Sequence, residues 1–254
     1  MNLSEDGICI VKDFLGSDQI KDLNNEFDLL CNRLSINGRS GYYLISKNYK
    51  TIPLPSIVFR SSNILEIALD IRDVLSIQEP NLKKENIKLT AIQAFEEISS
   101  KPLPWHTDNR DGMYRAFIYL QGGSYDSGAF RFMLGTHKRN YYVRHMLSKD
   151  QIKSLKDKIY IAQGEPGTLV IANTVGFHGN QPRNKKRRIL VFEFQQKNQV
   201  SKKSSIFISS FQLSERVIKN IQLFNNGVNK EEYFHGDDNY LGNKTMKIPD
   251  KLIN

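Results

Sequence analysis

Two stretches in the first third of the chain carry apolar residues every three to four positions, which is the spacing of one face of a helix. In the first stretch these residues are Ile20, Leu23, Phe27 and Leu30. In the second stretch they are Ile64, Ile67, Ala68, Ile71, Val74 and Leu75. We expect one helix from the N-cap Ser17 to about Arg33, and a second helix that stops before Pro80. A short apolar run, residues 8–11, predicts a strand ahead of the first helix.

From Ile87 the apolar pattern changes to a period of two, which indicates a β-strand. The residues expected to share one face of this strand are Ile87, Leu89, Ala91, Gln93 and Phe95. Up to about residue 210 the chain then consists of short β-like runs separated by glycine-containing turns. These runs are residues 114–120, 130–134, 168–173 and 188–194. A capping-box pattern from Ser148 to Gln151 starts one helical insert among them.

Two helices followed by many short strands are typical of a β-sandwich or a jelly roll, so we expect a mainly β protein with flanking helices. The chain has 254 residues and shows no repeat or linker, which favours a single domain over residues 1–254. Within it we expect a helical part at about residues 1–85 and a β core at about residues 86–200. The remainder, about residues 201–254, should carry one helix near residues 214–224 and a polar tail.

The composition is that of an ordinary globular protein, with 39% apolar and 25% charged residues. No apolar run approaches the roughly 18 residues that span a bilayer, and the N-terminus lacks the profile of a signal peptide, so we expect a cytoplasmic protein without a membrane partner. Cys9 and Cys31 lie in apolar patterns and are expected to be reduced packing residues. The net charge of +9 suits nucleic acid, an anionic membrane surface or an acidic small molecule, although a basic run such as residues 183–188 more often forms a solvated surface.

Two His-x-Asp patterns occur in the chain, and only the first can be completed as a metal site. His106 and Asp108 follow an extended run, in which residues two positions apart point to the same side. A distant histidine, His178, comes after a later apolar run, whereas no histidine follows the second pattern, His235 and Asp237. Two histidines and one carboxylate leave open positions on one face of Fe(II), where a chelating co-substrate and dioxygen can bind.

An arginine at the head of an apolar run supports the same chemistry. A keto acid bound to a metal at one end leaves a distal carboxylate, which a guanidinium can hold through two parallel hydrogen bonds. Arg187 and Arg188 both stand at the start of such a run. Successive strand residues face opposite ways, so only one of them can point inward. The pattern leaves open which one does, and whether both merely end the basic cluster.

The order of these motifs resembles the phytanoyl-CoA dioxygenase family of Fe(II)/2-oxoglutarate-dependent oxygenases, which share a double-stranded β-helix, a cupin-like jelly roll. The stretches that carry the resemblance are residues 6–7, 14–15, 105–108, 127–132, 134–138, 164–170, 178–180 and 187–191. The resemblance implies that His106, Asp108 and His178 bind Fe(II). It also implies that Arg187, rather than its neighbour, holds the distal carboxylate of 2-oxoglutarate.

The resemblance assigns further residues around this site. Asn180 stands where the family often has a serine that touches the co-substrate, and Gln93 matches a strand position near it. Halogenating relatives have a small residue in place of the metal carboxylate, so the presence of Asp108 favours hydroxylation or a related oxidation. His137 matches a turn motif of the family, and we interpret it as structural rather than as a fourth ligand.

The expected activity is a dioxygenase that uses Fe(II), 2-oxoglutarate and O2 to hydroxylate a small, polar or anionic metabolite, with release of succinate and CO2. One alternative is an inactive metal-binding or ligand-binding module of the same fold, which the intact ligand pattern argues against. Another is a nucleic-acid-directed oxygenase, which the positive charge suggests without any recognition motif. Tyr114 and Arg115 follow the metal motif, and the sequence leaves open which of them faces the substrate. The sequence does not indicate an oligomeric state.

Overall fold

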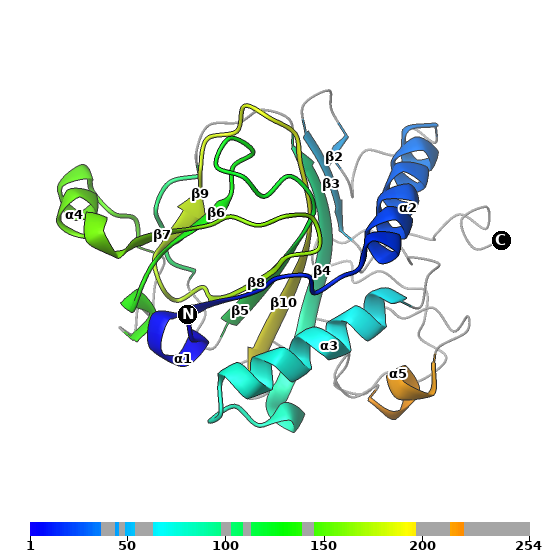
Figure 1. Ribbon diagram of the computed structural model, residues 1–254, viewed down its shortest axis with the longest axis horizontal. Coiled ribbons are helices and arrows are strands. Elements are labelled where there is room, and N and C mark those ends of the chain that lie inside the picture. The colour runs from blue at the N-terminus through cyan, green and yellow to red at the C-terminus, as the bar shows by residue number, and fades with distance from the viewer. Residues whose placement is uncertain are drawn as a thin grey trace, which may run out of the picture.

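Two antiparallel β-sheets face each other in the computed structural model of the protein (Figure 1). The large sheet has seven strands, in the order β1 (Ile8–Val11), β8 (Leu169–Asn173), β5 (Met113–Gln121), β10 (Arg187–Gln196), β4 (Ile87–Glu97), β3 (Tyr49–Pro53) and β2 (Leu44–Ile45). The small sheet has three strands, in the order β7 (Ile159–Ala162), β6 (Phe130–Met133) and β9 (His178–Asn180). The expectation of a mainly β protein is confirmed.

The structure describes residues 1–36, 44–45, 49–53, 63–97, 103–108, 113–138, 145–196 and 214–220. The four β-like runs predicted after the first long strand correspond to β5, β6, β8 and β10. The second His-x-Asp pattern, His235 and Asp237, lies outside the described residues. So does the part of the predicted final helix that follows residue 220.

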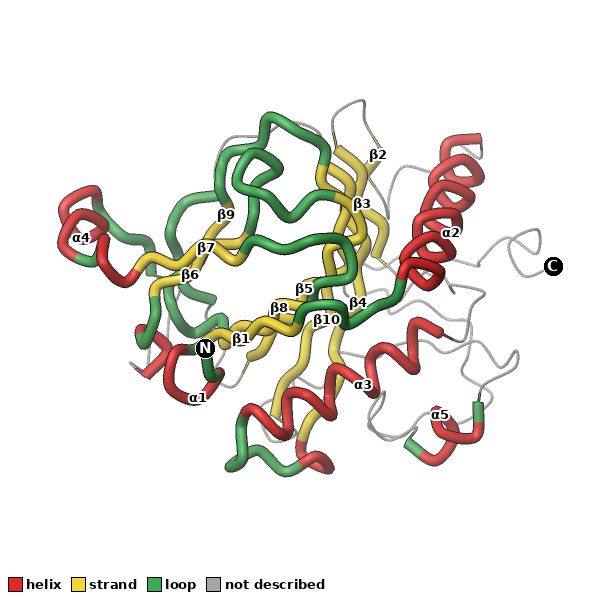
Figure 2. The backbone as a smooth tube through the Cα atoms, viewed as in Figure 1, coloured by secondary structure: helices red, strands yellow, loops and turns green. Residues whose placement is uncertain are grey.

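Helices cover the face of the large sheet that points away from the small sheet (Figures 1 and 2). The two long ones are α2 (Ser17–Ile36) and α3 (Asn63–Gln78), and α3 ends ahead of Pro80 as predicted. The shorter helices are α1 (Leu3–Asp6), α4 (Lys149–Ser154) and α5 (Glu215–Lys219), with 3-10 turns η2 (Lys84–Asn86), η3 (Thr136–Lys138) and η4 (Lys156–Lys158). The predicted capping box at Ser148 and Gln151 starts α4. Within the described ranges, no helix is both long and apolar enough to cross a membrane.

Alternate residues of the central strands build two separate cores. On β10, Leu190 and Phe192 pack toward the helices together with α2 and α3 residues such as Phe27. Ile189 and Val191 pack instead between the two sheets. Strands of the large sheet are therefore apolar on both faces, because each face has its own covering layer. Cys9 and Cys31 are free and buried, in agreement with the expected packing role.

The prediction that the odd-numbered residues from Ile87 to Phe95 share one face is wrong. Glu193 of β10 pairs with Ala91, whereas the next residue, Phe194, pairs with Leu89. Thr90 is therefore an extra residue, and such a bulge reverses the alternation of side chains along the strand. Ile87 and Leu89 pack toward the helices, while Phe95 packs against the core between the sheets.

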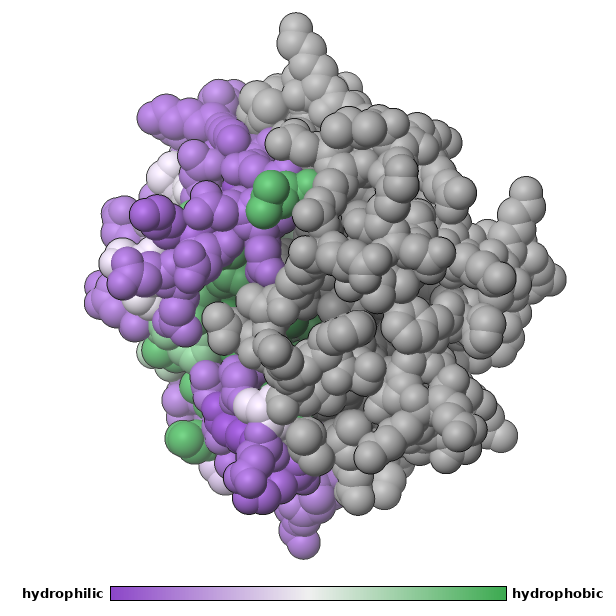
Figure 3. Space-filling view, turned by 90° about the vertical axis from the view of Figure 1, so that its right-hand side faces the viewer, coloured by the Kyte–Doolittle hydropathy of each residue, from purple (hydrophilic) through white to green (hydrophobic). Residues whose placement is uncertain are grey.

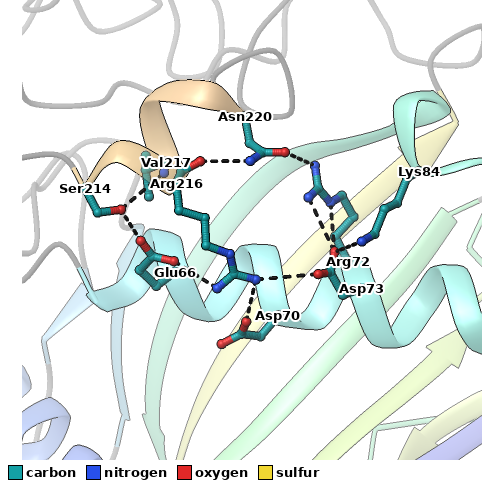
Figure 4. Close-up of polar contacts among 9 residues, drawn as sticks. All are labelled: Glu66, Asp70, Arg72, Asp73, Lys84, Ser214, Arg216, Val217 and Asn220. Carbon is teal, nitrogen blue, oxygen red and sulfur yellow. Dashed lines mark hydrogen bonds and ion pairs between the residues drawn. The ribbon is translucent and has the colours of Figure 1, made fainter.

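The short helix α5 is attached to α3 through charged and apolar contacts (Figure 4). Arg216 lies 3.0 Å from Glu66 and 2.7 Å from Asp70 of α3. Val217 is fully buried in the core on this side of the large sheet. Seen from the right-hand side of Figure 1, the described part of the surface is largely hydrophilic (Figure 3).

Candidate metal centre

The two candidate histidine ligands are neighbours because their backbones are hydrogen-bonded to each other. The N–H of His106 donates to the carbonyl of His178 at 3.0 Å, and the N–H of His178 donates to the carbonyl of His106 at 2.9 Å. His178 begins β9, whereas His106 belongs to the segment of residues 103–108 ahead of β5. This pairing places the centroids of the two imidazole rings 4.3 Å apart.

Asp108 joins the histidines from the same segment as His106. Its backbone N–H donates to the carbonyl of Thr174 at 2.9 Å. Its Oδ1 lies 3.9 Å from His106 Nε2 and its Oδ2 lies 3.8 Å from His178 Nε2, too far for hydrogen bonds. One donor atom from each of the three residues lies within 4.8 Å of the other two. All three could therefore bind the same ion.

Both imidazoles are oriented with Nε2 toward the carboxylate. His106 Nδ1 lies 2.8 Å from the carbonyl oxygen of Pro104, and His178 Nδ1 lies 2.9 Å from that of Gly176. A carbonyl can only accept a hydrogen bond, so each Nδ1 must carry the proton. The lone pair of each neutral ring is then on Nε2, where a metal can use it.

The charge states of the side chains in the centre suit a bound cation. Burial lowers the pKa of His178 to about 4, so the ring is neutral near pH 7. Burial alone would raise the pKa of Asp108, but opposing effects, of which the charge of Arg115 is the largest, hold it below its usual value. Within the described residues, His178 Nε2 and Asp108 Oδ2 are buried without a hydrogen-bond partner. Buried polar atoms of this kind need a partner, and a metal ion would be one.

The structure decides between Tyr114 and Arg115, because only Arg115 faces the centre. Tyr114 is buried in the core on the helix side. Arg115 Nη1 lies 3.6 Å from Asp108 Oδ2, and its Nη2 lies 2.9 Å from Glu193 Oε1 on β10. The sequence reasoning did not single out Glu193. The sequence did contain an indication of its role, because Glu193 is an acidic residue within the apolar run that ends at Phe194.

Arg187 points into the space between the sheets. It lies on the same face of β10 as Ile189 and Val191, which belong to the core there. Its Nη1 donates to the carbonyl of Gly128, and its Nη2 donates to Glu97 Oε2 at 2.8 Å. The side chain is only 3% exposed. Of the two arginines, Arg187 is therefore the one that could meet a ligand between the sheets.

Arg188 faces the opposite way and joins the large sheet to α2. Its Nη2 lies 2.7 Å from Asp28 Oδ1, and its Nη1 donates to Asn24 Oδ1 at 2.9 Å. Its guanidinium also donates to Glu96 and lies 4.4 Å from the ring centroid of Phe27. These partners belong to the helix layer and to the neighbouring strand. Arg188 therefore has a structural role.

The other expected site residues lie in the surroundings of the centre or away from it. Asn180 is half-buried on β9, two positions after His178 and thus on the same side of the strand. Gln93 is half-buried on β4, opposite Val191. The Nε2 of His137 lies 3.0 Å from the carbonyl oxygen of Ser4, which ties η3 to α1. The contact of His137 agrees with a structural role.

The fold is a jelly roll, and the buried pair of histidines with one carboxylate forms a candidate metal site within it. HygX from Streptomyces hygroscopicus, solved with nickel, 2-oxoglutarate and hygromycin B bound, has a similar structure, with a TM-score of 0.56 at 15% identity over 76% of this chain and 84% of that one. EvdO2 from Micromonospora carbonacea var. aurantiaca gives a TM-score of 0.59 at 14% identity over 77% and 88% of the two chains. SnoK, a non-heme alpha-ketoglutarate-dependent carbocyclase from nogalamycin biosynthesis, gives a TM-score of 0.57 at 12% identity. The match covers 76% of this chain and 81% of that one.

At these identities the likeness shows the fold, and it confirms the expected jelly roll. No protein-family model and no curated protein matches the chain. The resemblance to the phytanoyl-CoA dioxygenase family therefore stays a prediction that rests on the order of the sequence motifs.

Proposed function

We propose that the protein is an Fe(II)/2-oxoglutarate-dependent oxygenase. The observation that carries the proposal is the group of two buried histidines, His106 and His178, with the half-buried Asp108, whose donor atoms lie within 4.8 Å of one another. Two of these atoms, His178 Nε2 and Asp108 Oδ2, have no hydrogen-bond partner among the described residues. A divalent cation would satisfy them. HygX, which has a similar fold, holds nickel and 2-oxoglutarate, and this supports the choice of co-substrate.

Three residues would hold the iron and leave part of its coordination sphere open. Two neutral imidazoles and one ionised carboxylate are the ligands expected for a non-heme Fe(II) oxygenase. Fe(II), 2-oxoglutarate and O2 together supply oxidative chemistry that releases succinate and CO2 and hydroxylates a substrate. Arg187 would bind the distal carboxylate of 2-oxoglutarate, since its planar guanidinium matches a carboxylate.

Neighbouring residues would position these groups. The contact of Arg115 with Glu193 fixes the guanidinium, and its charge favours the ionised form of Asp108, the form that binds a metal. Asn180 and Gln93 are the weaker candidates for contacts with the co-substrate. They are supported by their positions on β9 and on the face of β4 between the sheets.

The substrate that we expect is a small polar or anionic molecule. HygX holds hygromycin B, so a protein of this fold can accept a small molecule. The net charge of +9 favours a negatively charged molecule. Met146, which is 62% exposed and paired with His106 across an isolated bridge, would add apolar contact beside the candidate centre.

The proposal is tested by anaerobic titration of the metal-free protein with Fe(II) and 2-oxoglutarate. We expect a visible charge-transfer band in the wild-type protein and its loss in Asp108→Ala and His178→Ala. The matched control is His145→Ala, which removes an exposed histidine outside the candidate centre and should keep the band. A wild-type protein without the band, or an Asp108→Ala variant with unchanged affinity, would overturn the site. Conversion of 2-oxoglutarate to succinate then distinguishes an enzyme from an inactive module.

A further inference from the structure

The residue before the first candidate ligand, Trp105, packs in a small core of its own. Its side chain is 4% exposed and belongs to an apolar cluster with Met133 and Phe177. This cluster is separate from the two cores that border the large sheet. The ligand segment, residues 103–108, is thus anchored by an aromatic side chain next to His106.

Arg131 lies on the face of β6 that points away from the large sheet. Its neighbours Phe130 and Phe132 pack into the core between the sheets, and successive strand residues face opposite ways. Met133 shares the outer face with Arg131 and packs with Trp105. Arg131 and Trp105 therefore meet on the outside of the small sheet, where the guanidinium carbon lies 4.4 Å from the ring centroid.

The guanidinium of Arg131 contacts the ligand segment on both sides of Pro104. It lies over the ring of Trp105 in cation–π geometry, and its Nη2 donates to the carbonyl of Leu103 at 3.0 Å. The carbonyl oxygen of Pro104 lies 2.8 Å from Nδ1 of His106. One side chain therefore holds the residues that flank the carbonyl by which His106 is oriented.

Gly179 leaves the room that this arrangement needs. It follows His178 on β9 and pairs with Arg131 across the small sheet. A Cβ atom at this position would lie 2.7 Å from the carbonyl oxygen of Leu103 and 3.2 Å from Nε of Arg131. A larger residue here would therefore push the ligand segment away from the strand that carries the other histidine.

Burial of the Arg131 charge is compensated by the ligand segment. Burial lowers the pKa of Arg131 below its usual value, because it disfavours the charged form. In the described part of the chain, no carboxylate forms an ion pair with this side chain, and its Nε is buried without a hydrogen-bond partner. Its hydrogen bond and its ring contact go to Leu103 and Trp105. The interactions of this arginine thus hold the ligand segment rather than a salt bridge.

We propose that Arg131 is a positioning residue of the metal centre, which it serves from the outer face of the small sheet through Trp105 and Leu103. The inference rests on the proposed function, in which His106 and Asp108 bind the metal. Without the guanidinium, the ligand segment samples more positions in the metal-free protein, and binding of the ion has to order it. Arg131 thus raises the affinity for the metal by organising its ligands in advance.

The test measures the affinity of the metal-free protein for Fe(II) by anaerobic calorimetry, together with urea unfolding of the same variants. In Arg131→Met we expect the Fe(II) affinity to fall about two- to thirtyfold, the range of a lost cation–π contact. Arg131→Lys should lose less, because it keeps a cation beside the ring. Trp105→Leu should also lose affinity. The double variant should lose less than the product of the two single losses, because the two side chains act as a pair.

The matched control is Arg188→Met, which removes a buried arginine that contacts the helix layer. We expect this variant to be less stable and yet to bind Fe(II) as the wild type does. If Arg131→Met does not fold, Arg131→Lys and Trp105→Phe test the same contact with smaller changes. Unchanged Fe(II) affinity in the folded Arg131 variants, or an equal loss in Arg188→Met, would overturn the positioning role and leave the proposed function standing. A wild-type protein that binds no Fe(II) would overturn the proposed function itself.

Discussion

The two candidate histidine ligands are oriented by carbonyl groups of their own segments. His106 is bonded to Pro104, and His178 to Gly176, each two positions earlier in the chain. Because these contacts are local, the orientation of each ring depends on few residues. The order of His106, Asp108 and His178 along the chain predicted that they form one site, but the sequence did not show these carbonyl contacts.

His137 couples the stability of the fold to pH. It contacts the carbonyl of Ser4, and burial lowers its pKa below the usual value. The folded protein thus takes up this proton less readily than the unfolded chain does. The free energy of unfolding should therefore fall as the pH drops below the unfolded value of about 6.5.

Chemical unfolding of the metal-free protein between about pH 7 and pH 5 checks this expectation. We expect stability to decrease with acidification, and to decrease less steeply in His137→Gln. His178, whose pKa burial lowers to about 4, contributes with the same sign in both proteins. Equal slopes for the variant and the wild type would show that His137 has no part in the effect.

At the scale of elements, the bulge in β4 marks the limit of what a pattern of apolar positions can predict. The strand itself was predicted from its period of two, but its faces were assigned wrongly beyond Thr90. Thr90 Oγ1 donates to the carbonyl of Glu193 at 3.2 Å, on a strand distant in the sequence. A bulge depends on such a partner strand, and the period within one strand cannot show it.

The attachment of α5 to α3 should depend on its apolar residue more than on its ion pairs. Val217 is fully buried, so Val217→Ala should lower the free energy of unfolding by roughly 1–3 kcal/mol through loss of packing. Arg216 is 43% exposed, and its ion pairs with Glu66 and Asp70 are screened by solvent. Arg216→Ala should therefore change stability by less than about 1 kcal/mol. Urea unfolding of both variants measures the difference, and the reverse order would contradict this explanation.

For the whole molecule, the sequence predicted the class of fold. It also predicted that His106, Asp108 and His178 lie close together, as they do, but it did not predict the buried charge pairs. The fold class follows from the order of helices and short strands, which is visible along the chain. The pairing of Glu97 with Arg183, and of Arg115 with Glu193, joins residues far apart in sequence. Such pairs depend on strand register, which a single sequence does not show. The sequence likewise left open which of Arg187 and Arg188 points inward.

Arg188 links the helix layer to the large sheet, so its loss should affect the whole molecule rather than the site. Arg188→Met would leave Glu96 buried without its strongest partner, and we expect a loss of roughly 3 kcal/mol in the free energy of unfolding. The affinity of the folded variant for 2-oxoglutarate should stay unchanged. Denaturant titration and anaerobic ligand binding measure the two effects. A large loss of 2-oxoglutarate affinity would reassign the co-substrate site to Arg188.

The backbone pairing of His106 with His178 gives a bound ion a second consequence. These residues belong to segments on the order of 70 positions apart, so an ion held by both would bind the folded protein and not the unfolded chain, and would stabilise the fold by mass action. Thermal unfolding should accordingly occur at a higher temperature with Fe(II) or a redox-inert divalent ion than with a chelator. Asp108→Ala should lose most of this difference. The lifetime of the folded protein in a cell would then follow the supply of that metal ion.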